Sequence, residues 1–253
     1  MKYDGQGKSL LEVHDLSVSF DATPVLQHVC LDIRPQQIVA IVGPNGSGKT
    51  TILKTIGGLI KAARGRVLFE GEPIGSLDVW EIVRRGIVYV PEGMSVFRDM
   101  TVIENLEIGA YLNRKVIPER LKSVFELFPE LLEKRQALAG VLSGGQQRMV
   151  TLARGLMAGA RLLLLDDPFL GLSPKIVKRF CDTFRVLRQN GVTLFIAGQH
   201  VRRILNVADF AFLIEDGTIT LTGPGPEVLN NRHLKQILFG SDTASQHTVR
   251  ELV

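Results

Sequence analysis

The sequence has few cysteines and aromatic residues and no long apolar run: its 253 residues include two cysteines, one tryptophan and three tyrosines. Cys30 and Cys181 lie far apart, without the close spacing of a metal site, so we expect two reduced and mostly buried thiols. Apolar runs such as residues 162–165 fall far short of the ~20 residues that cross a bilayer. Residues 1–8 lack the apolar core of a signal peptide. We therefore expect a soluble or peripheral protein, for which any pore would be another chain.

The numbers of basic and acidic residues are nearly equal. Thirty Lys and Arg residues face 26 Asp and Glu residues, giving a formal charge of +4, and no Lys/Arg-rich run is present. This charge is too small to argue for nucleic acid as a partner. With 45% hydrophobic residues, the chain is able to bury a sizeable core as one α/β domain or two small ones.

Short apolar strands alternate with helical patterns along most of the chain, which predicts a mainly parallel sheet covered on both faces. We expect strands over residues 11–20, 37–42, 66–70, 87–90, 162–165, 192–196 and 210–214, and helices over 50–59, 79–85, 118–132, 149–157 and 174–189. Thr101 to Glu104 has the form of a capping box. Residues 93–158 are predicted to form a helical insertion, and residues 241–253 a loosely held tail.

The residues from Gly43 to Thr50 read GPNGSGKT, which matches the phosphate-loop pattern G-x-x-x-x-G-K-[ST]. The pattern lies between a predicted strand and a predicted helix, the context that such a loop requires. Its backbone N–H groups and the start of the helix would surround phosphate oxygens. Lys49 would reach the β- and γ-phosphates, and the Thr50 hydroxyl would bind Mg²⁺.

Two carboxylates follow the buried strand at residues 162–165. Asp166 and Asp167 stand at its carboxyl end, the edge where ligands bind in parallel sheets. Asp166 is predicted to hold Mg²⁺, directly or through water, and Asp167 to orient and polarise the attacking water. Taken alone, two acids capping a strand and turn would be a plausible alternative explanation of the pair; the phosphate loop favours the catalytic interpretation.

Ser143 to Gln146 reads SGGQ, just before a predicted helix. Its exposed N–H groups would form a second cradle for an anion. One nucleotide does not need two such cradles from one chain, so the second one would grip a γ-phosphate held by another copy or a partner. A plain serine-capped helix preceded by glycine remains the alternative.

With these motifs, the chain resembles the ATP-binding subunits of ABC transporters over about residues 9–240. Within that family it is most similar to the subunits of branched-chain amino acid importers. The sequences that carry this second resemblance are YVPEG at residues 89–93, VF at 96–97, MTVIENL at 100–106 and GLSP at 171–174.

The resemblance implies an α/β fold: a P-loop NTPase (RecA-like) core with an antiparallel β subdomain and an inserted α-helical subdomain. It also implies a head-to-tail dimer that uses ATP and Mg²⁺. The implied cofactor-binding residues are Phe20, which would stack on adenine, with Gly43, Pro44, Asn45, Gly46, Ser47, Gly48, Lys49, Thr50, Thr51, Ser143, Gly144, Gly145 and Gln146. The implied catalytic residues are Asp167, Gln199 and His200, and the implied Mg²⁺ residues are Thr50, Glu92 and Asp166. Glu92 would also contact the membrane subunit, and residues 170–173 the opposite ATPase subunit.

Two positions depart from the family pattern. The family has Glu where this chain has Asp167, whose carboxylate lies about 1.5 Å further back, and an error of about 1 Å can slow a reaction on the order of 10²-fold. The switch residue, usually His, aligns with Gln199 or, after a shift of one residue, with His200. We hypothesise that this site binds ATP well and hydrolyses it slowly, while a partner subunit's site does most of the hydrolysis.

The expected function is therefore an ATPase that powers an importer of branched-chain or related amino acids or amides. Its expected partners are a second ABC ATPase subunit, integral membrane permease subunits and, indirectly, a periplasmic solute-binding protein, with no nucleic acid. Its expected location is the cytoplasmic face of the inner membrane, as a peripheral subunit. The alternatives are an exporter subunit for lipid or polysaccharide, a pore-less ABC ATPase of DNA repair or translation, and a regulatory subunit with impaired hydrolysis.

Overall fold

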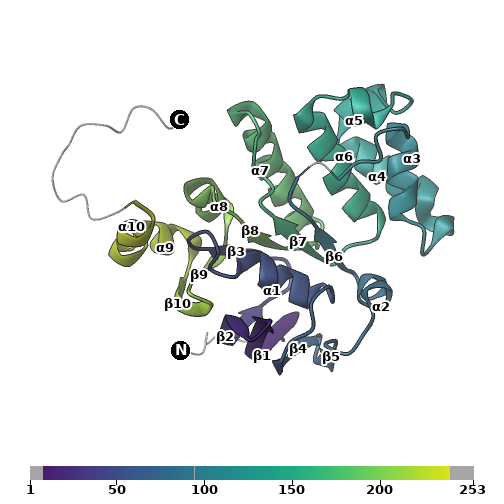
Figure 1. Ribbon diagram of the computed structural model, residues 1–253. Helices are drawn as coiled ribbons and strands as arrows, with labels where there is room; N and C mark the ends of the chain where they lie inside the picture. The colour runs from purple at the N-terminus through teal and green to yellow at the C-terminus, as the bar shows by residue number, and fades with distance from the viewer. Residues whose placement is uncertain (1–7, 94, 240–253) are drawn as a thin grey trace, which may run out of the picture.

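The computed structural model describes residues 8–93 and 95–239, so the predicted tail at 241–253 lies outside the described residues. Six strands form the central sheet (Figure 1). In spatial order they are β10 (Thr218–Gly223), β9 (Phe210–Glu215), β3 (Ile38–Val42), β8 (Thr193–Ala197), β7 (Leu162–Asp166) and β6 (Ile87–Val90). The pairs β9–β3, β3–β8, β8–β7 and β7–β6 are parallel, whereas β10 is antiparallel to β9. The parallel strands therefore bring their carboxyl ends to one edge of the sheet.

The central strands are buried on both faces, which is why they read as continuous apolar runs in the sequence. On β7, Leu163 and Leu165 belong to the core on one face of the sheet, and Leu162 and Leu164 to the core on the other. All five residues of β3, β7 and β8 are buried.

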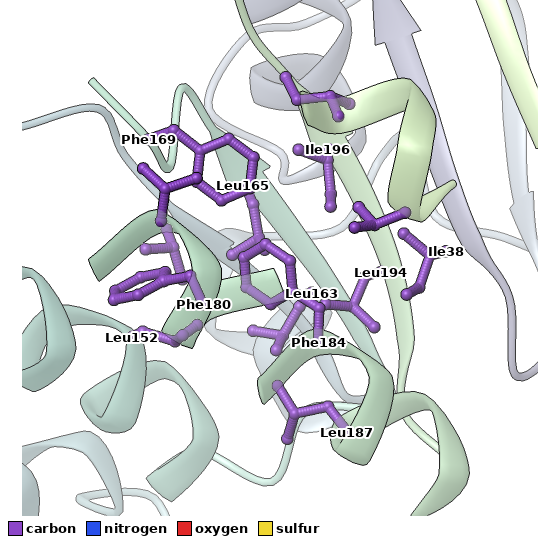
Figure 2. Close-up of a cluster of buried hydrophobic side chains, with 14 of the residues drawn as sticks. Ile38, Leu152, Leu163, Leu165, Phe169, Phe180, Phe184, Leu187, Leu194 and Ile196 are labelled. Carbon is purple, nitrogen blue, oxygen red and sulfur yellow. The ribbon is translucent and has the colours of Figure 1, made fainter. Parts of the chain in front are cut away.

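Helix α7 (Pro174–Gln189) covers one face of the sheet. Figure 2 shows its Phe180, Phe184 and Leu187 beside residues from β7, β8 and β3. Phe184 lies between two other rings: its centroid is 5.8 Å from that of Phe169 and 6.0 Å from that of Phe180. This packing anchors the segment that follows β7, and with it the position of the two adjacent aspartates.

A second sheet covers the opposite face together with α1 (Lys49–Ile56). It is antiparallel and has the order β2 (Thr23–Ile33), β1 (Leu11–Phe20), β4 (Arg64–Phe69) and β5 (Glu72–Pro73). The mixed parallel and antiparallel sheets with covering helices confirm the predicted P-loop α/β fold.

Between β6 and β7 the chain is helical, and these helices gather on one side of the sheet (teal in Figure 1). They are α3 (Val102–Gly109), η1 (Arg114–Val116), α4 (Ile117–Leu127), α5 (Pro129–Glu133), η2 (Ala139–Val141) and α6 (Gly144–Met157). The capping box at Thr101 and Glu104 starts α3 as expected. The domain boundaries at 93 and 158 stay a prediction.

Four further helices complete the described chain: α2 (Val79–Arg84), α8 (Val201–Val207), α9 (Gly225–Asn230) and α10 (Arg232–Phe239). Across residues 8–93 and 95–239, none of the helices combines the length and apolar character needed to span a bilayer.

Two expectations from the sequence were wrong. The single helix over 118–132 is two helices, because Pro129 disfavours a helical backbone at Phe128, which adopts φ −129° and ψ 73°. The thiols are not mostly buried: Cys30 is exposed and Cys181 is half-buried. Cys30 lies on β2, a strand with one exposed face, where the side chain points outward.

Candidate functional site

The Gly-rich loop joins β3 to α1 at the carboxyl edge of the central sheet. It contains the predicted residues Gly43, Pro44, Asn45, Gly46, Ser47 and Gly48, and α1 begins with Lys49, Thr50 and Thr51. Gly48 precedes α1 with φ 104°, and a Cβ there would lie 2.5 Å from Leu26 Cδ2. Only glycine meets both conditions, which explains its place in the motif.

Lys49 is folded back into this loop. Its side chain is buried, and Nζ donates hydrogen bonds to the carbonyl oxygens of Gly43 (2.9 Å) and Pro44 (2.7 Å). Burial lowers the pKa of the Lys49 ammonium, while the charges of Asp167 and Asp166 act to raise it. The loop therefore encloses a cationic group where the sequence places a phosphate.

Ser47 supplies an independent sign of a ligand in the loop. Its Oγ is buried, and among the described residues no group forms a hydrogen bond with it. A buried hydroxyl without a partner is costly, so an oxygen-rich ligand in the loop would stabilise it. The loop thus fits the phosphates of a nucleotide.

Asp166, the last residue of β7, receives two hydroxyl hydrogen bonds. Thr50 Oγ1 donates to Oδ1 over 3.0 Å, and the Tyr89 hydroxyl donates to Oδ2 over 2.9 Å. Burial raises the pKa of the Asp166 carboxyl, and these two hydrogen bonds act to lower it. The hydroxyl of Thr50 and the carboxylate of Asp166 form a pair of hard oxygen ligands, which fits Mg²⁺.

Asp167 has a backbone conformation that is rare outside glycine, with φ 40°. Its N–H donates to the carbonyl of Ala197 (2.8 Å), and its Oδ1 accepts from the N–H of Gln199 (3.0 Å). Both contacts join the end of β7 to the end of β8. The structure thus brings the predicted catalytic carboxylate and the predicted switch segment together.

Gln199 and His200 connect β8 to α8. The Gln199 side chain is exposed, and His200 is the half-buried residue immediately before the helix. Only the Gln199 backbone has a hydrogen bond to the aspartates, so the choice between the two side chains as switch residue stays open.

Glu92 follows β6 at the carboxyl edge of the central sheet, whereas Phe20 belongs to the second sheet. Glu92 is exposed two residues after β6, and its charge acts on Tyr89 and Arg148. Phe20 ends β1 with 47% of its surface exposed. An aromatic ring that is this exposed is free to stack on a planar ligand, so its predicted contact with adenine stays open.

The second predicted cradle lies at the start of α6. Ser143 caps the helix, and the Ser143 and Gln146 side chains form a reciprocal capping box: Gln146 N–H donates to Ser143 Oγ (3.4 Å) and Ser143 N–H to Gln146 Oε1 (3.2 Å). Ser143 and Gly144 are exposed, and Gly145 is half-buried, where an added Cβ would lie 3.1 Å from Ile176 Cγ1. The helix start therefore has a surface open to another molecule, as the prediction requires, and the capping serine is also what the alternative predicts.

Arg148 is a residue of this region to which the sequence gave no role. Its buried guanidinium donates to five carbonyl oxygens, from Pro91 and Gly93 after β6 and from Asp166, Asp167 and Pro168 after β7. Burial lowers its pKa against the nearby acidic charges. A charged residue directly before the buried run Met149–Val150 was the only sequence signal of this role.

Comparisons with known proteins agree on one family. The pattern of the ABC transporter family matches residues 26–170, more than half of the chain. The high-affinity branched-chain amino acid transport ATP-binding protein BraG of Pseudomonas aeruginosa is 36% identical over 91% of this chain and 100% of its own. The probable branched-chain amino acid transport ATP-binding protein LivF of Archaeoglobus fulgidus is 35% identical over 91% and 99%.

An export protein is almost as similar: the lipopolysaccharide export system ATP-binding protein LptB of Haemophilus influenzae is 33% identical over 92% of this chain and 98% of its own. Among solved structures, an ADP-bound ATP-binding cassette of an ABC transporter superposes with a TM-score of 0.84 at 26% identity, covering 92% of this chain and 99% of that one. A nucleotide-free cassette superposes with a TM-score of 0.82 at 28% identity, with the same coverage.

The family match, the fold and the geometry of the site all lead to the same conclusion. The matched pattern begins before the phosphate loop and ends after Asp167. Members of this family hydrolyse ATP. The chain belongs to the ABC transporter family, as one of its ATP-binding and ATP-hydrolysing subunits.

Proposed function

We propose that this subunit powers an importer of branched-chain or related amino acids or amides. The observation that carries the proposal is the similarity, over nearly their whole lengths, to two proteins named for branched-chain amino acid transport. The similarity to a lipopolysaccharide export protein, at 33% identity, supports export of a lipid or polysaccharide as the second candidate.

In the proposed mechanism, residues at the carboxyl edge of the central sheet have separate roles. Lys49 and the loop N–H groups bind the phosphates, Thr50 and Asp166 hold Mg²⁺ with Glu92 nearby, and Asp167 orients the attacking water. When bound, the metal would neutralise charge that develops on the phosphates. The buried and unpaired Ser47 hydroxyl supports the phosphate assignment.

The proposed working unit has two ATPase subunits. The exposed start of α6, from Ser143 to Gln146, would contact the γ-phosphate held by the other subunit, and Phe20 would stack on the adenine. ATP binding would close the two subunits, and hydrolysis would reopen them. The closure would act on permease subunits, with a periplasmic solute-binding protein delivering the solute and this chain at the cytoplasmic face of the inner membrane.

Uptake measurements test the direction and the solute together. In the cell that makes this protein, deletion of its gene should abolish energy-dependent uptake of radiolabelled leucine, isoleucine and valine. The wild-type gene should restore uptake, and a Lys49→Ala variant should not. Unchanged uptake together with loss of lipopolysaccharide from the cell surface would reject import in favour of export.

A second experiment identifies the partners. The tagged full chain should co-purify from detergent-solubilised membranes with permease subunits and with a second ABC ATPase subunit or another copy of itself. Normal uptake in a strain where the chain binds no membrane protein would contradict the proposed partnership.

A further inference from the structure

A cavity of about 430 Å³ lies at the amino ends of β6 and β7, away from the sheet edge that carries the phosphate loop. Its volume is within the range of roughly 300–1,000 Å³ that small-molecule sites occupy. It is lined by Phe69 and by five charged side chains, those of Glu70, Glu72, Arg84, Arg85 and Arg161. The name amino-edge cavity is used below for the space that these six residues border.

One ion pair takes up part of this charge. The Arg161 guanidinium donates two hydrogen bonds to the carboxylate of Glu70, one of 2.7 Å from Nη1 to Oε2 and one from Nη2 to Oε1. These hydrogen bonds lower the pKa of the Glu70 carboxyl and raise the pKa of Arg161, so both groups are charged at neutral pH. Arg161 also lies over the Phe69 ring, with its guanidinium carbon 5.6 Å from the ring centroid. Glu70 and Arg161 therefore form a wall of the cavity without net charge.

Gly86 allows Arg161 to take this position. It lines the cavity directly before β6, and its φ of 91° is in the left-handed region that favours glycine. A Cβ at this residue would lie 2.8 Å from Arg161 Cγ, and the Gly86 carbonyl oxygen accepts a hydrogen bond of 2.8 Å from the Arg161 N–H. A side chain at position 86 would therefore displace the arginine from the wall.

The other three charged groups have no counterion in the chain. In the parts that the structure describes, Arg84 and Arg85 form no ion pair with a carboxylate, and Glu72 forms none with a basic side chain. Arg84 lies against the ring of Trp80, with its guanidinium carbon 4.9 Å from the ring centroid. This contact uses the face of the guanidinium and not its N–H donors. Two positive charges and one negative charge thus border the same space.

We propose that the amino-edge cavity binds an α-amino acid with an apolar side chain, whose carboxylate contacts Arg84 and Arg85 and whose ammonium group contacts Glu72. Guanidinium groups donate strong hydrogen bonds to a carboxylate, and an ammonium group donates them to the carboxylate of a glutamate. A simple anion would leave Glu72 without a partner, and a simple cation would leave the two arginines without one. The Phe69 ring suits an apolar side chain such as that of leucine.

This cavity is separate from the nucleotide site. Arg161 directly precedes β7, whereas Asp166 is the last residue of that strand. The four residue steps from Leu162 to Asp166 span about 13 Å in an extended strand. The amino acid would therefore not compete with a nucleotide for the phosphate loop. The inference uses only the charges of this cavity, so it does not rest on the proposed function.

Isothermal titration calorimetry of the full chain tests the proposal with three probes of the same carbon skeleton. They are L-leucine, 4-methylpentanoate, which lacks the ammonium group, and L-leucinamide, which lacks the carboxylate. Leucine should bind at one site per chain with a dissociation constant below about 1 mM, and the two analogues should bind at least about tenfold more weakly. Saturating ADP should change the leucine affinity less than about twofold. Equal binding of leucine and 4-methylpentanoate, or no saturable binding of leucine, would overturn the proposal.

Two variants assign the ends of the ligand. Arg85 and Glu72 are exposed, so Arg85→Gln and Glu72→Gln should both fold. Arg85→Gln should weaken binding of leucine and of 4-methylpentanoate alike, by at least about tenfold. Glu72→Gln should weaken binding of leucine alone and so remove the preference for the amino acid. Arg185→Gln is the matched control, because Arg185 pairs with Asp182 on α7 and does not line the cavity; it should change neither affinity.

Trp80 gives an independent readout, because it is the only tryptophan in the chain and contacts Arg84. Leucine should change its fluorescence with the dissociation constant found by calorimetry, and Arg84→Gln should abolish that change. Leucine binding that neither Arg84→Gln nor Arg85→Gln weakens would place the ligand elsewhere and refute the proposal. A Glu72→Gln variant that still prefers leucine to 4-methylpentanoate would equally refute it.

The results also separate this inference from the proposed function, since none of these measurements involves transport. A chain that supports uptake of branched-chain amino acids and does not bind leucine would overturn the inference alone. A chain that binds leucine as described and does not support uptake would support the inference and reject only the proposed function.

Discussion

The backbone N–H of Gln199 donates a 3.0 Å hydrogen bond to Oδ1 of Asp167, so the loop after β8 holds the carboxylate that follows β7. This contact draws the carboxylate toward the predicted switch segment. Asp is one methylene shorter than the Glu that the family resemblance implies at this position, so in the proposed mechanism a carboxylate held in this way would have less reach toward a water at the γ-phosphate.

Asp167→Glu should therefore accelerate ATP hydrolysis. A carboxylate misplaced by about 1 Å can cost on the order of 10²-fold in rate, and the longer side chain would recover part of that loss. Single-turnover hydrolysis of radiolabelled ATP measures the effect, with Asp167→Asn as the inactive control. An equal or slower rate for the Glu variant would contradict the hypothesis that this site is slow.

Lys49→Ala should abolish retention of ATP, because the variant removes the only side-chain cation that the loop itself encloses in the described structure. Equilibrium dialysis with labelled ATP and Mg²⁺ measures the loss. Lys178→Ala, on the exposed part of α7, removes the same charge far along the chain and should bind normally. Normal ATP binding by the Lys49 variant would refute the phosphate-loop assignment.

Tyr89→Phe should raise the Mg²⁺ requirement of hydrolysis. The Tyr89 hydroxyl donates to Asp166, and this hydrogen bond lowers the pKa of the carboxyl, which burial raises. Without it the Asp166 pKa rises further, so protons compete with Mg²⁺ at higher pH and the acidic limb of the rate profile shifts upward. The half-saturating Mg²⁺ concentration should increase about fivefold, as expected for roughly 1 kcal/mol.

Tyr111→Phe is the control for this prediction, because Tyr111 is exposed and does not contact Asp166. An unchanged Mg²⁺ requirement and pH profile for Tyr89→Phe would show that its hydroxyl does not support the metal site.

The sequence indicated features whose residues are close along the chain or belong to motifs. A β-rich run, glycines and a helix start predicted the phosphate loop between β3 and α1, and the two acids after a buried run predicted the end of β7. The pairing of Thr50 with Asp166 agrees with their shared predicted role at Mg²⁺. The strand at 11–20 and the helix at 174–189 have the predicted bounds.

The remaining features depend on how distant segments pack. Tyr89 reaches Asp166 because β6 lies beside β7, with Tyr89 opposite Leu164, and sequence alone does not show that register. Arg148 donates hydrogen bonds to backbone carbonyl oxygens. Every residue has such an oxygen, so the residue types in the sequence do not indicate these contacts. Strand β2 was not predicted because its exposed and buried positions follow a broken alternation, with irregular pairing to β1.

Arg148→Met should destabilise the fold strongly. It would leave five buried or half-buried carbonyl oxygens without their guanidinium donor, at a cost of about 3–5 kcal/mol in the free energy of unfolding. Arg148→Lys keeps the charge and up to three donors, so it should lose less. Urea denaturation followed by circular dichroism gives the difference for each variant.

Arg185→Met is the control for that series, since its ion pair with Asp182 is exposed and such pairs contribute about 0–1 kcal/mol. A loss for Arg148→Met no larger than that of the control would show that the carbonyl contacts do not hold the segments after β6 and β7 in place.

Phe184→Ala should cost about 3–5 kcal/mol, because the ring is fully buried between α7 and the sheet and its loss leaves a cavity (Figure 2). Val186→Ala, two residues later on α7, removes a side chain that is 40% exposed and should cost less than about 1 kcal/mol. Urea denaturation of both variants measures the contrast. Because Phe184 stacks on Phe169, which follows the aspartates by two residues, the Phe184 variant should also hydrolyse ATP more slowly while it remains folded. Equal stability of the two variants would mean that α7 does not anchor the catalytic edge of the sheet.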